Sequence, residues 1–285
     1  MTTEQIKQAA EKIRLIALDI DGTSVNSVGE ITEDTRETIQ ELICAGYIVV
    51  PATGRGFYGL REQIGVEGIR YVISADGAVV TDGLSGEILM KVVIPRERAA
   101  LLAEELQNDK NCIYLHLDDP LSTHMAAYKN EKIYLQYKSK GFLPSQNIFC
   151  GEMKDYVLQE SREVLKMGLR FEEGDRFQKY ESAIEKKFPD INGFRVDASA
   201  MEFTASGASK ATALRALCAI LKIRPEQVCA IGDNGNDIEM LKYAGLGVAM
   251  GNAIAQTMAI ADYVTGSNDE NGVSEFFKNF LSKKL

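Results

Sequence analysis

Short apolar runs alternate with amphipathic stretches between residues 15 and 74 of the chain. Thr32 predicts the start of a helix that runs to about Cys44, because it precedes two acidic residues, and a second helix is predicted at 57–64. Strands that alternate with helices of about ten to fifteen residues indicate βαβ units, which build a parallel sheet covered on both faces. The apolar runs have the length of buried strands and span 15–18, 47–51 and 70–74.

The same alternation returns in the last third of the chain. Strands are predicted there at 227–231, 246–250 and 262–265, and helices at 209–221, 237–244 and 253–260. The middle differs, because none of its candidate strands, at 89–94, 112–117 and 193–196, ends in an acid. We therefore expect an α/β protein with a doubly wound parallel sheet formed by 1–84 and 200–285, interrupted by an α+β domain at 85–199. Residues 2–13 are expected to add a surface helix.

Composition supports a folded protein of two domains. The 285 residues are 45% hydrophobic and 26% charged. A net charge of −9, without a Lys/Arg-rich block, argues against binding to nucleic acid or to an anionic membrane. The first fourteen residues are polar and fit no signal peptide, glycines dilute the apolar stretch 244–261, and the five cysteines are scattered. We expect a cytoplasmic protein that is a monomer or a small homo-oligomer.

Acidic residues end the first predicted strand. Asp19 and Asp21 are two residues apart, so in extended backbone both carboxylates face the same side. Two acids this close repel each other unless a cation lies between them or one keeps a proton. Gly22 and Thr23 follow with a tight turn whose N–H groups can hold an anion. An Asx-type turn after a strand is the alternative explanation of these residues.

Three further segments carry chemistry at predicted strand or helix ends. The sequence ATGR at 52–55 supplies a hydroxyl, a flexible backbone and a guanidinium, and GDNGND at 232–237 adds a second acidic strand end. Lys210 lies at the start of a helix, where a positive charge is slightly unfavourable, so its presence indicates another role. Carboxylates, a hydroxyl and cations around one point are typical of a divalent cation beside a phosphoryl group.

These motifs, DIDGT at 19–23, ATGR, the lysine of GASKATAL and GDNGND, occur in the order of the four motifs of the haloacid dehalogenase-like (HAD) phosphohydrolases, which the chain resembles. The long insert between the second and third motifs is similar to that of the Cof-type subfamily, whose α/β cap covers the active site. The resemblance implies a Rossmann-like core with an inserted cap. It further implies a Mg²⁺-dependent phosphatase that hydrolyses a small phosphorylated metabolite, such as a sugar phosphate, through an aspartyl phosphate.

The resemblance also implies a role for each motif residue. Asp19 is the implied nucleophile, and Asp21 the general acid that later becomes the base activating water. Mg²⁺ would be held by the Asp19 carboxylate, the Asp21 backbone carbonyl and Asp233, with Asp237 in support. The implied contacts to phosphate and substrate come from Gly22, Thr53, Gly54, Arg55, Lys210 and Asn236.

Two positions depart from the family's pattern, and the insert offers further candidates. Ser24 stands where an apolar residue is usual, and Asp76 where Cof-type sequences commonly have Asn. A carboxylate at 76 would disfavour an anionic group nearby, which weakens inference of the substrate from relatives. In the insert, His116, His124 and Tyr128 are candidates for substrate contact, with a structural role as the alternative for the histidines.

Three other functions fit parts of the sequence. A phosphotransferase or phosphomutase would use the same motifs, because water and a sugar hydroxyl compete for one aspartyl phosphate. A dinucleotide-dependent oxidoreductase would explain GRGFYG at 54–59 with Asp76 downstream, but it leaves the other motifs unexplained. A non-enzymatic phospho-receiver also pairs acids with a lysine, although it places them on different strands.

Overall fold

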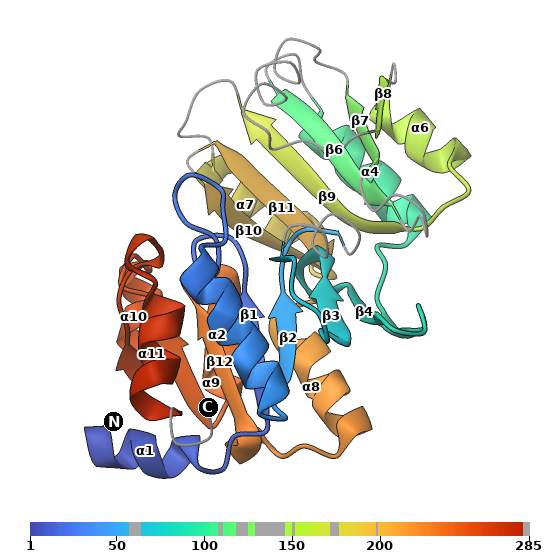
Figure 1. The fold of residues 1–285 in the computed structure, drawn as a ribbon. Coiled ribbons are helices and arrows are strands. Elements are labelled where there is room, and N and C mark those ends of the chain that lie inside the picture. The colour runs from blue at the N-terminus through green and yellow to red at the C-terminus, as the bar shows by residue number, and fades with distance from the viewer. Residues whose placement is uncertain are drawn as a thin grey trace. The chain divides into compact units, whose positions relative to one another are not determined.

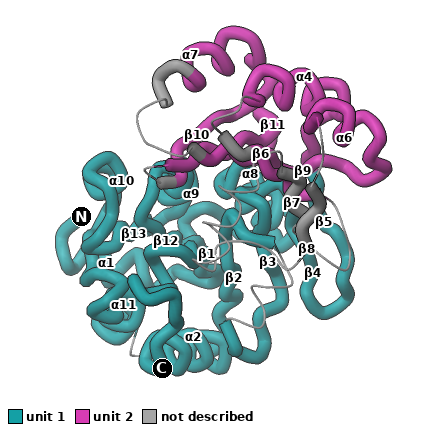
Figure 2. The backbone as a smooth tube through the Cα atoms, turned by 90° about the horizontal axis from the view of Figure 1, so that it is seen from above, with its two compact units in different colours: residues 1–91, 209–285 teal, residues 92–208 magenta. Residues whose placement is uncertain are grey.

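The computed structural model describes residues 1–56, 64–107, 111–117, 125–128, 146–149, 152–171, 177–197 and 199–281. Figure 2 shows the chain divided into two compact units. Unit 1 comprises Met1–Lys91 and Ser209–Leu285, and unit 2 comprises Val92–Ala208. Unit 2 is therefore an insertion in the sequence of unit 1. The helix expected at 57–64 lies almost wholly outside the described residues.

Unit 1 is built on an eight-stranded sheet. The strands from β14 to β3 in its spatial order run parallel, and β1 lies in the middle between β12 and β2. The chain leaves β1 toward β2 on one side and later fills the other side with β12, so the strand order reverses at β1. Such a reversal is where open α/β sheets bind their ligands. In spatial order the strands are β14 (Tyr263–Val264), β13 (Leu246–Ala249), β12 (Val228–Gly232), β1 (Leu15–Asp19), β2 (Ile48–Ala52), β3 (Tyr71–Ser74), β4 (Val79–Asp82) and β5 (Ile88–Lys91).

The far edge of this sheet is antiparallel, which the sequence did not predict. β4 pairs antiparallel with β3, and β5 pairs antiparallel with β4. The connections are too short for a parallel crossover, so the chain can only turn back on itself. Only the first half of the expected strand at 89–94 thus belongs to β5 of unit 1, and the unit boundaries lie seven and nine residues beyond the expected 84/85 and 199/200.

Helices cover both faces of the unit 1 sheet. Figure 1 shows α2 and α11 on one face and α8 on the other, in agreement with the packing of α2 on α11 and of α8 on α9. The Thr32 side chain caps α2 by accepting a hydrogen bond from the Thr35 N–H at 3.2 Å, as the sequence predicts. The α-helices are α1 (Thr3–Ala10), α2 (Glu33–Cys44), α8 (Lys210–Leu221), α9 (Ile238–Tyr243), α10 (Ala255–Ile260) and α11 (Gly272–Phe280), and the 3₁₀ helices are η1 (Ala75–Gly77), η2 (Pro225–Gln227), η3 (Gly235–Asp237) and η4 (Asn268–Glu270).

Unit 2 has its own sheet and its own hydrophobic core. Its antiparallel sheet has the order β10-β11-β9-β6, and a separate parallel pair is formed by β7 and β8. Apolar side chains of α4, α6, α7 and the sheet form one buried cluster. The elements are α4 (Arg96–Leu106), β6 (Asn111–Leu117), β7 (Met125–Tyr128), β8 (Gln146–Phe149), α6 (Met153–Gln159), β9 (Val164–Phe171), α7 (Phe177–Lys187), β10 (Ile191–Asp197) and β11 (Ala200–Ala205).

Membrane-spanning helices and the state of the cysteines can be checked in the described residues. No helix among them is long and apolar enough to cross a membrane. Cys44, Cys218 and Cys229 carry free thiols, whereas the Cys112 side chain and Cys150 lie outside the described residues.

A buried network of hydrogen bonds joins three strands of the unit 2 sheet. Tyr114 on β6 lies opposite Gly168 on β9, and its hydroxyl donates a hydrogen bond at 2.6 Å to Glu202 on β11. The other Glu202 oxygen accepts from Lys166 Nζ at 2.8 Å, and Lys166 is 1% exposed. A Cβ at position 168 would lie 1.8 Å from the Tyr114 ring, so the tyrosine reaches Glu202 only because residue 168 has no side chain.

Gly168→Ala should therefore destabilise unit 2 by about 1–3 kcal/mol, because the Tyr114 ring must move and its bond to Glu202 must break. Amide hydrogen exchange in peptides from β6, β9 and β11 should report the change. Gly207→Ala is a matched control in the same unit, since its new Cβ would meet only Val92 Cγ1 at 3.6 Å. Equal exchange in the two variants would contradict this account of Gly168.

Candidate active site

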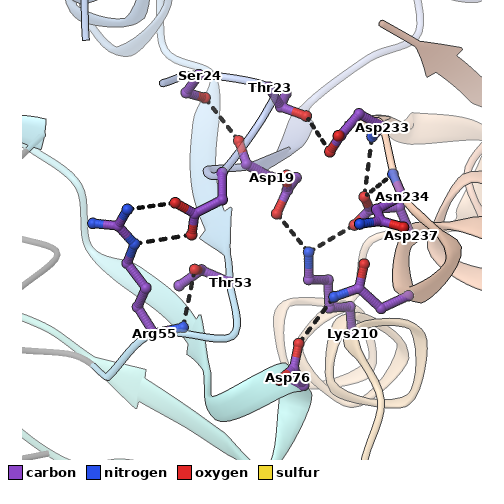
Figure 3. Close-up of polar contacts among 12 residues, drawn as sticks. Asp19, Thr23, Ser24, Thr53, Arg55, Asp76, Lys210, Asp233, Asn234 and Asp237 are labelled. Carbon is purple, nitrogen blue, oxygen red and sulfur yellow. Dashed lines mark hydrogen bonds and ion pairs between the residues drawn. The ribbon is translucent and has the colours of Figure 1, made fainter. Parts of the chain in front are cut away.

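The predicted motif residues of unit 1 meet at the carboxyl ends of its parallel strands. Asp19 ends β1, Thr53 follows β2, and Asp233 follows β12. Lys210 comes from the first turn of α8, after Ser209, whose side chain caps the helix. Parallel pairing of β1 with both β2 and β12 aligns these strand ends, so residues far apart in sequence become neighbours (Figure 3).

Three carboxylates form a compact acidic cluster. Oxygen atoms of Asp19, Asp233 and Asp237 lie within 4.8 Å of one another, a spacing that allows them to share a metal ion. Asp237 is buried, and its Oδ2 accepts hydrogen bonds from the backbone N–H groups of Asp233 and Asn234, both at 3.0 Å. The Thr23 hydroxyl donates to Asp233 Oδ1 at 3.3 Å. Asp237 thus orders the loop that presents Asp233.

The buried ammonium group of Lys210 joins two members of this cluster. Its Nζ donates to Asp19 Oδ1 at 2.5 Å and to Asp237 Oδ1 at 2.7 Å. Burial works against the charge of Lys210, but Asp19 and Asp237 outweigh burial and raise the pKa of the ammonium group above its usual value. Lys210 therefore stays charged and fixes the position of the Asp19 carboxylate.

One ammonium group does not balance three carboxylates. Burial and the nearby charge of Asp237 raise the pKa of Asp19 well above its usual value, although Lys210 acts in the opposite direction. Burial, with Asp237 adding to it, raises the pKa of Asp233 to about 6. Carboxylate oxygens are the donors that Mg²⁺ prefers, so the donor set and its excess negative charge fit a divalent cation.

The turn after β1 passes unusually close to Asp233. Gly22 has φ +81°, in the left-handed region, and a Cβ there would lie 2.4 Å from Asp233 Oδ2. Only glycine allows both the backbone conformation and the close approach. The Gly22 carbonyl is held in turn by the Asn252 side-chain amide at 2.8 Å. The backbone of 21–22 and the Asp233 carboxylate are thereby kept together.

Known proteins are similar to this chain in sequence and in fold. A profile of haloacid dehalogenase-like hydrolases matches residues 16–277. The chain belongs to this family. Phosphatase YwpJ of Bacillus subtilis is 30% identical to it over 94% of this chain and 100% of that protein. The 5-amino-6-(5-phospho-D-ribitylamino)uracil phosphatase YcsE of the same organism is 31% identical over 94% of this chain and 96% of that protein.

Solved structures agree with the family assignment. A haloacid dehalogenase-like hydrolase from B. subtilis covers 93% of this chain and 99% of its own, with a TM-score of 0.81 and 26% identity. The protein is accordingly a Cof-type HAD phosphatase, a phosphoric monoester hydrolase. This confirms the fold class and enzyme class predicted from the motifs, and it decides against the dinucleotide-binding and receiver alternatives.

Asp21, two residues after Asp19, pairs with the guanidinium group of Arg55. Both oxygens of Asp21 accept hydrogen bonds from the Arg55 guanidinium, with Nε to Oδ2 at 2.9 Å. The Arg55 backbone N–H donates to the Thr53 hydroxyl oxygen at 3.1 Å, and Gly54 lies half-buried between them. Arg55, predicted to contact substrate, is thus paired with Asp21 in this structure.

Asp76 has a partner that the sequence did not reveal. The Asn236 side-chain nitrogen donates to Asp76 Oδ1 at 3.0 Å, and Asp76 is buried. Asp76 has φ +54°, and its N–H donates to the Thr53 carbonyl oxygen at 3.0 Å, so the loop after β3 is tied to the loop after β2. The Asn236 amide, predicted to bind phosphate, therefore directs its nitrogen toward Asp76. No sequence signal connects residues 160 positions apart.

The remaining candidates lie elsewhere or have local roles. The Ser24 hydroxyl is buried and donates to the Asp19 carbonyl oxygen at 2.8 Å, which supports the turn after β1. His116 is a buried residue of β6 in unit 2. His124 lies outside the described residues, and only the backbone of Tyr128 is described, in β7.

The raised pKa values predict how pH and Mg²⁺ act together on stability. Between the usual carboxyl pKa of 3.8 and about 6, the metal-free folded chain binds more protons at Asp233 than the unfolded chain, so this site loses stability as pH rises. Mg²⁺ binds the deprotonated carboxylates, so it should raise the melting temperature more at about pH 7.5 than at about pH 5.

Thermal unfolding with and without Mg²⁺ at both pH values measures this effect. Asp233→Asn should lose most of the Mg²⁺-induced increase at about pH 7.5. Asp34→Asn is the control, because Asp34 pairs with Lys278 between α2 and α11 and should leave the increase intact. A Mg²⁺ effect of equal size at the two pH values would contradict the assignment.

Proposed function

We propose that this phosphatase uses Mg²⁺ and hydrolyses a small phosphorylated metabolite through an aspartyl phosphate formed on Asp19. The observation that carries the proposal is the contact of Lys210 Nζ with both Asp19 and Asp237, beside Asp233. It holds the Asp19 carboxylate at the end of β1, where the strand order reverses, with a permanent cation beside it. A carboxylate nucleophile needs no histidine base to activate it.

Asp19 attacks the phosphorus atom, and the bond from phosphorus to the leaving-group oxygen breaks. Lys210, and Thr53 on the neighbouring loop, supply positive charge and hydrogen bonding for the phosphoryl oxygens. The cation would be held by the carboxylates of Asp19 and Asp233 and by the Asp21 carbonyl. Both Asp237 oxygens already have partners, which supports its role behind these ligands. Bound Mg²⁺ would offset the charge of the transferring phosphoryl group.

Asp21 is the proposed general acid and base. It gives a proton to the leaving alcohol, then takes one from the water that attacks the aspartyl phosphate. Its position two residues after Asp19 supports this role, because the strand end carries both groups to one site.

The proposed substrate is a phosphate monoester of a sugar or a similar polyol. The relative YcsE is named for a substrate whose phosphate is carried by a ribityl group, which supports this class. A panel of sugar and polyol phosphates, scored by release of inorganic phosphate, tests the class and distinguishes hydrolysis from transfer to a second alcohol.

Metal removal should abolish turnover. The cluster of three carboxylates would repel a dianionic ester unless a cation offsets its charge. EDTA should therefore eliminate hydrolysis of p-nitrophenyl phosphate, and added Mg²⁺ should restore it. Full activity in metal-free buffer would refute the proposed cofactor.

The two aspartates of the first motif should differ in how their loss depends on substrate. Asp19→Asn should lower kcat at least about a thousandfold on every ester, because an amide does not accept the phosphoryl group. Asp21→Asn should lose about a hundred- to ten-thousandfold on alkyl phosphates and less on p-nitrophenyl phosphate, whose leaving group needs little protonation. Equal losses of Asp21→Asn on both ester types would argue against separate roles.

A further inference from the structure

The ion pair between Arg55 and Asp21 links the loop after β2 to the loop after β1. The guanidinium uses Nε and Nη2 to engage both carboxylate oxygens, the forked geometry that an arginine forms and a lysine does not. In the view of Figure 3, Arg55 and Lys210 lie on opposite sides of Asp19. The two acids of the DIDGT motif are therefore paired with two different cations.

These two ion pairs differ sharply in burial. The side chains of Arg55 and Asp21 are 36% and 54% exposed, whereas those of Lys210 and Asp19 are 2% and 5% exposed. An exposed ion pair contributes little stability, so the closed and open forms of the Arg55 pair should differ in population by only about fivefold or less. Opening the buried pair would leave an uncompensated charge in the protein interior. Only the Arg55 pair is suited to open and close during a reaction cycle.

The pairing conflicts with the role proposed for Asp21. A general acid must direct an O–H group at the leaving oxygen, but each oxygen of Asp21 already accepts a hydrogen bond from Arg55. The pair must therefore open before Asp21 transfers a proton. Two hydrogen bonds anchor the Arg55 main chain: its N–H donates to the Thr53 hydroxyl, and its carbonyl oxygen accepts from the Ala75 N–H at 2.9 Å. Opening the pair therefore requires only the Arg55 side chain to move.

We propose that Arg55 is a positioning residue that exchanges from Asp21 to an oxygen of the bound phosphate ester, and that this exchange releases Asp21 for proton transfer. The inference rests on the function proposed above. Arg55 is anchored on the loop of Thr53, so an ester bound there offers the oxyanion geometry that a guanidinium prefers. The released Asp21 then serves the two proton transfers proposed above, to the leaving oxygen as the P–O bond breaks and from the attacking water.

The exchange makes a specific kinetic prediction for Arg55→Gln. Substrate loses a charge-assisted contact, so KM should rise by about ten- to a hundredfold. At saturation Asp21 is already free, so kcat should stay within about threefold of wild type on an alkyl ester, β-glycerol phosphate, and on p-nitrophenyl phosphate. Arg55→Lys keeps the charge without the fork and should recover part of the loss in KM.

A matched control is available in the same unit. Arg70 donates through Nε to Asp82 Oδ2 at 2.9 Å, and its side chain is 54% exposed. It precedes β3, at the end of the strand away from the site, so Arg70→Gln removes another arginine–aspartate pair, with a more buried aspartate, and should leave both KM and kcat unchanged. Thermal unfolding of all variants shows whether they remain folded.

The outcomes separate the alternatives. A fall in kcat of more than about threefold on the alkyl ester, whatever KM does, would show that Arg55 orients Asp21 throughout and would overturn the exchange. Unchanged KM and kcat would also overturn it, because Arg55 would then contact no substrate. Failure of the wild-type chain to release phosphate would contradict the proposed function. In that case, calorimetric binding of inorganic phosphate with Mg²⁺ still tests the exchange, since Arg55→Gln should bind it about ten- to a hundredfold more weakly and equal binding would overturn it.

Discussion

The contact of Lys210 with Asp19 and Asp237 is the interaction on which the rest of the active site depends. It joins the end of β1, the start of α8 and the 3₁₀ turn after β12 through one buried ammonium group. Removing one partner from such a pair leaves a buried charge without compensation, which typically costs about 3–5 kcal/mol. The three segments are therefore held together by the same charges that the proposed chemistry uses.

This arrangement leaves an excess of negative charge at the carboxyl end of β1. Three carboxylates meet one ammonium group, and burial magnifies their repulsion, as the raised pKa values of Asp19 and Asp233 show. Protons relieve the repulsion at low pH, and a divalent cation relieves it where the carboxylates are ionised. Gly22 lets the turn after β1 approach the Asp233 carboxylate without a side chain between them, so groups of both segments can lie beside one cation. The excess negative charge that a cation would offset is thus a property of the folded protein itself.

The sequence predicted most of this site because strand ends are a local signal. Apolar runs that end in DIDGT, ATGR and GDNGND place their polar residues at one edge of any parallel sheet, whatever the details of packing. The antiparallel β4 and β5 were missed because a hairpin edge and a crossover strand have similar apolar runs. The pairings of Asn236 with Asp76 and of Arg55 with Asp21 were missed for another reason. They depend on which of several possible partners lies nearest, and side-chain direction at a loop is set by tertiary structure.

Burial also separates two kinds of positive charge in this active site. A phosphoryl-transfer site needs one cation that keeps the nucleophile fixed while charge develops, and a buried lysine with two carboxylate partners meets that need. It also needs a donor that can follow the substrate, and a buried ion pair is too costly to break for that purpose. Arg55, at the half-exposed rim beside Thr53, can change partners at little cost. Because Asp21 is the partner of Arg55, the proposed exchange withholds the acid until an anion competes for the guanidinium, and it thereby couples proton transfer to substrate binding.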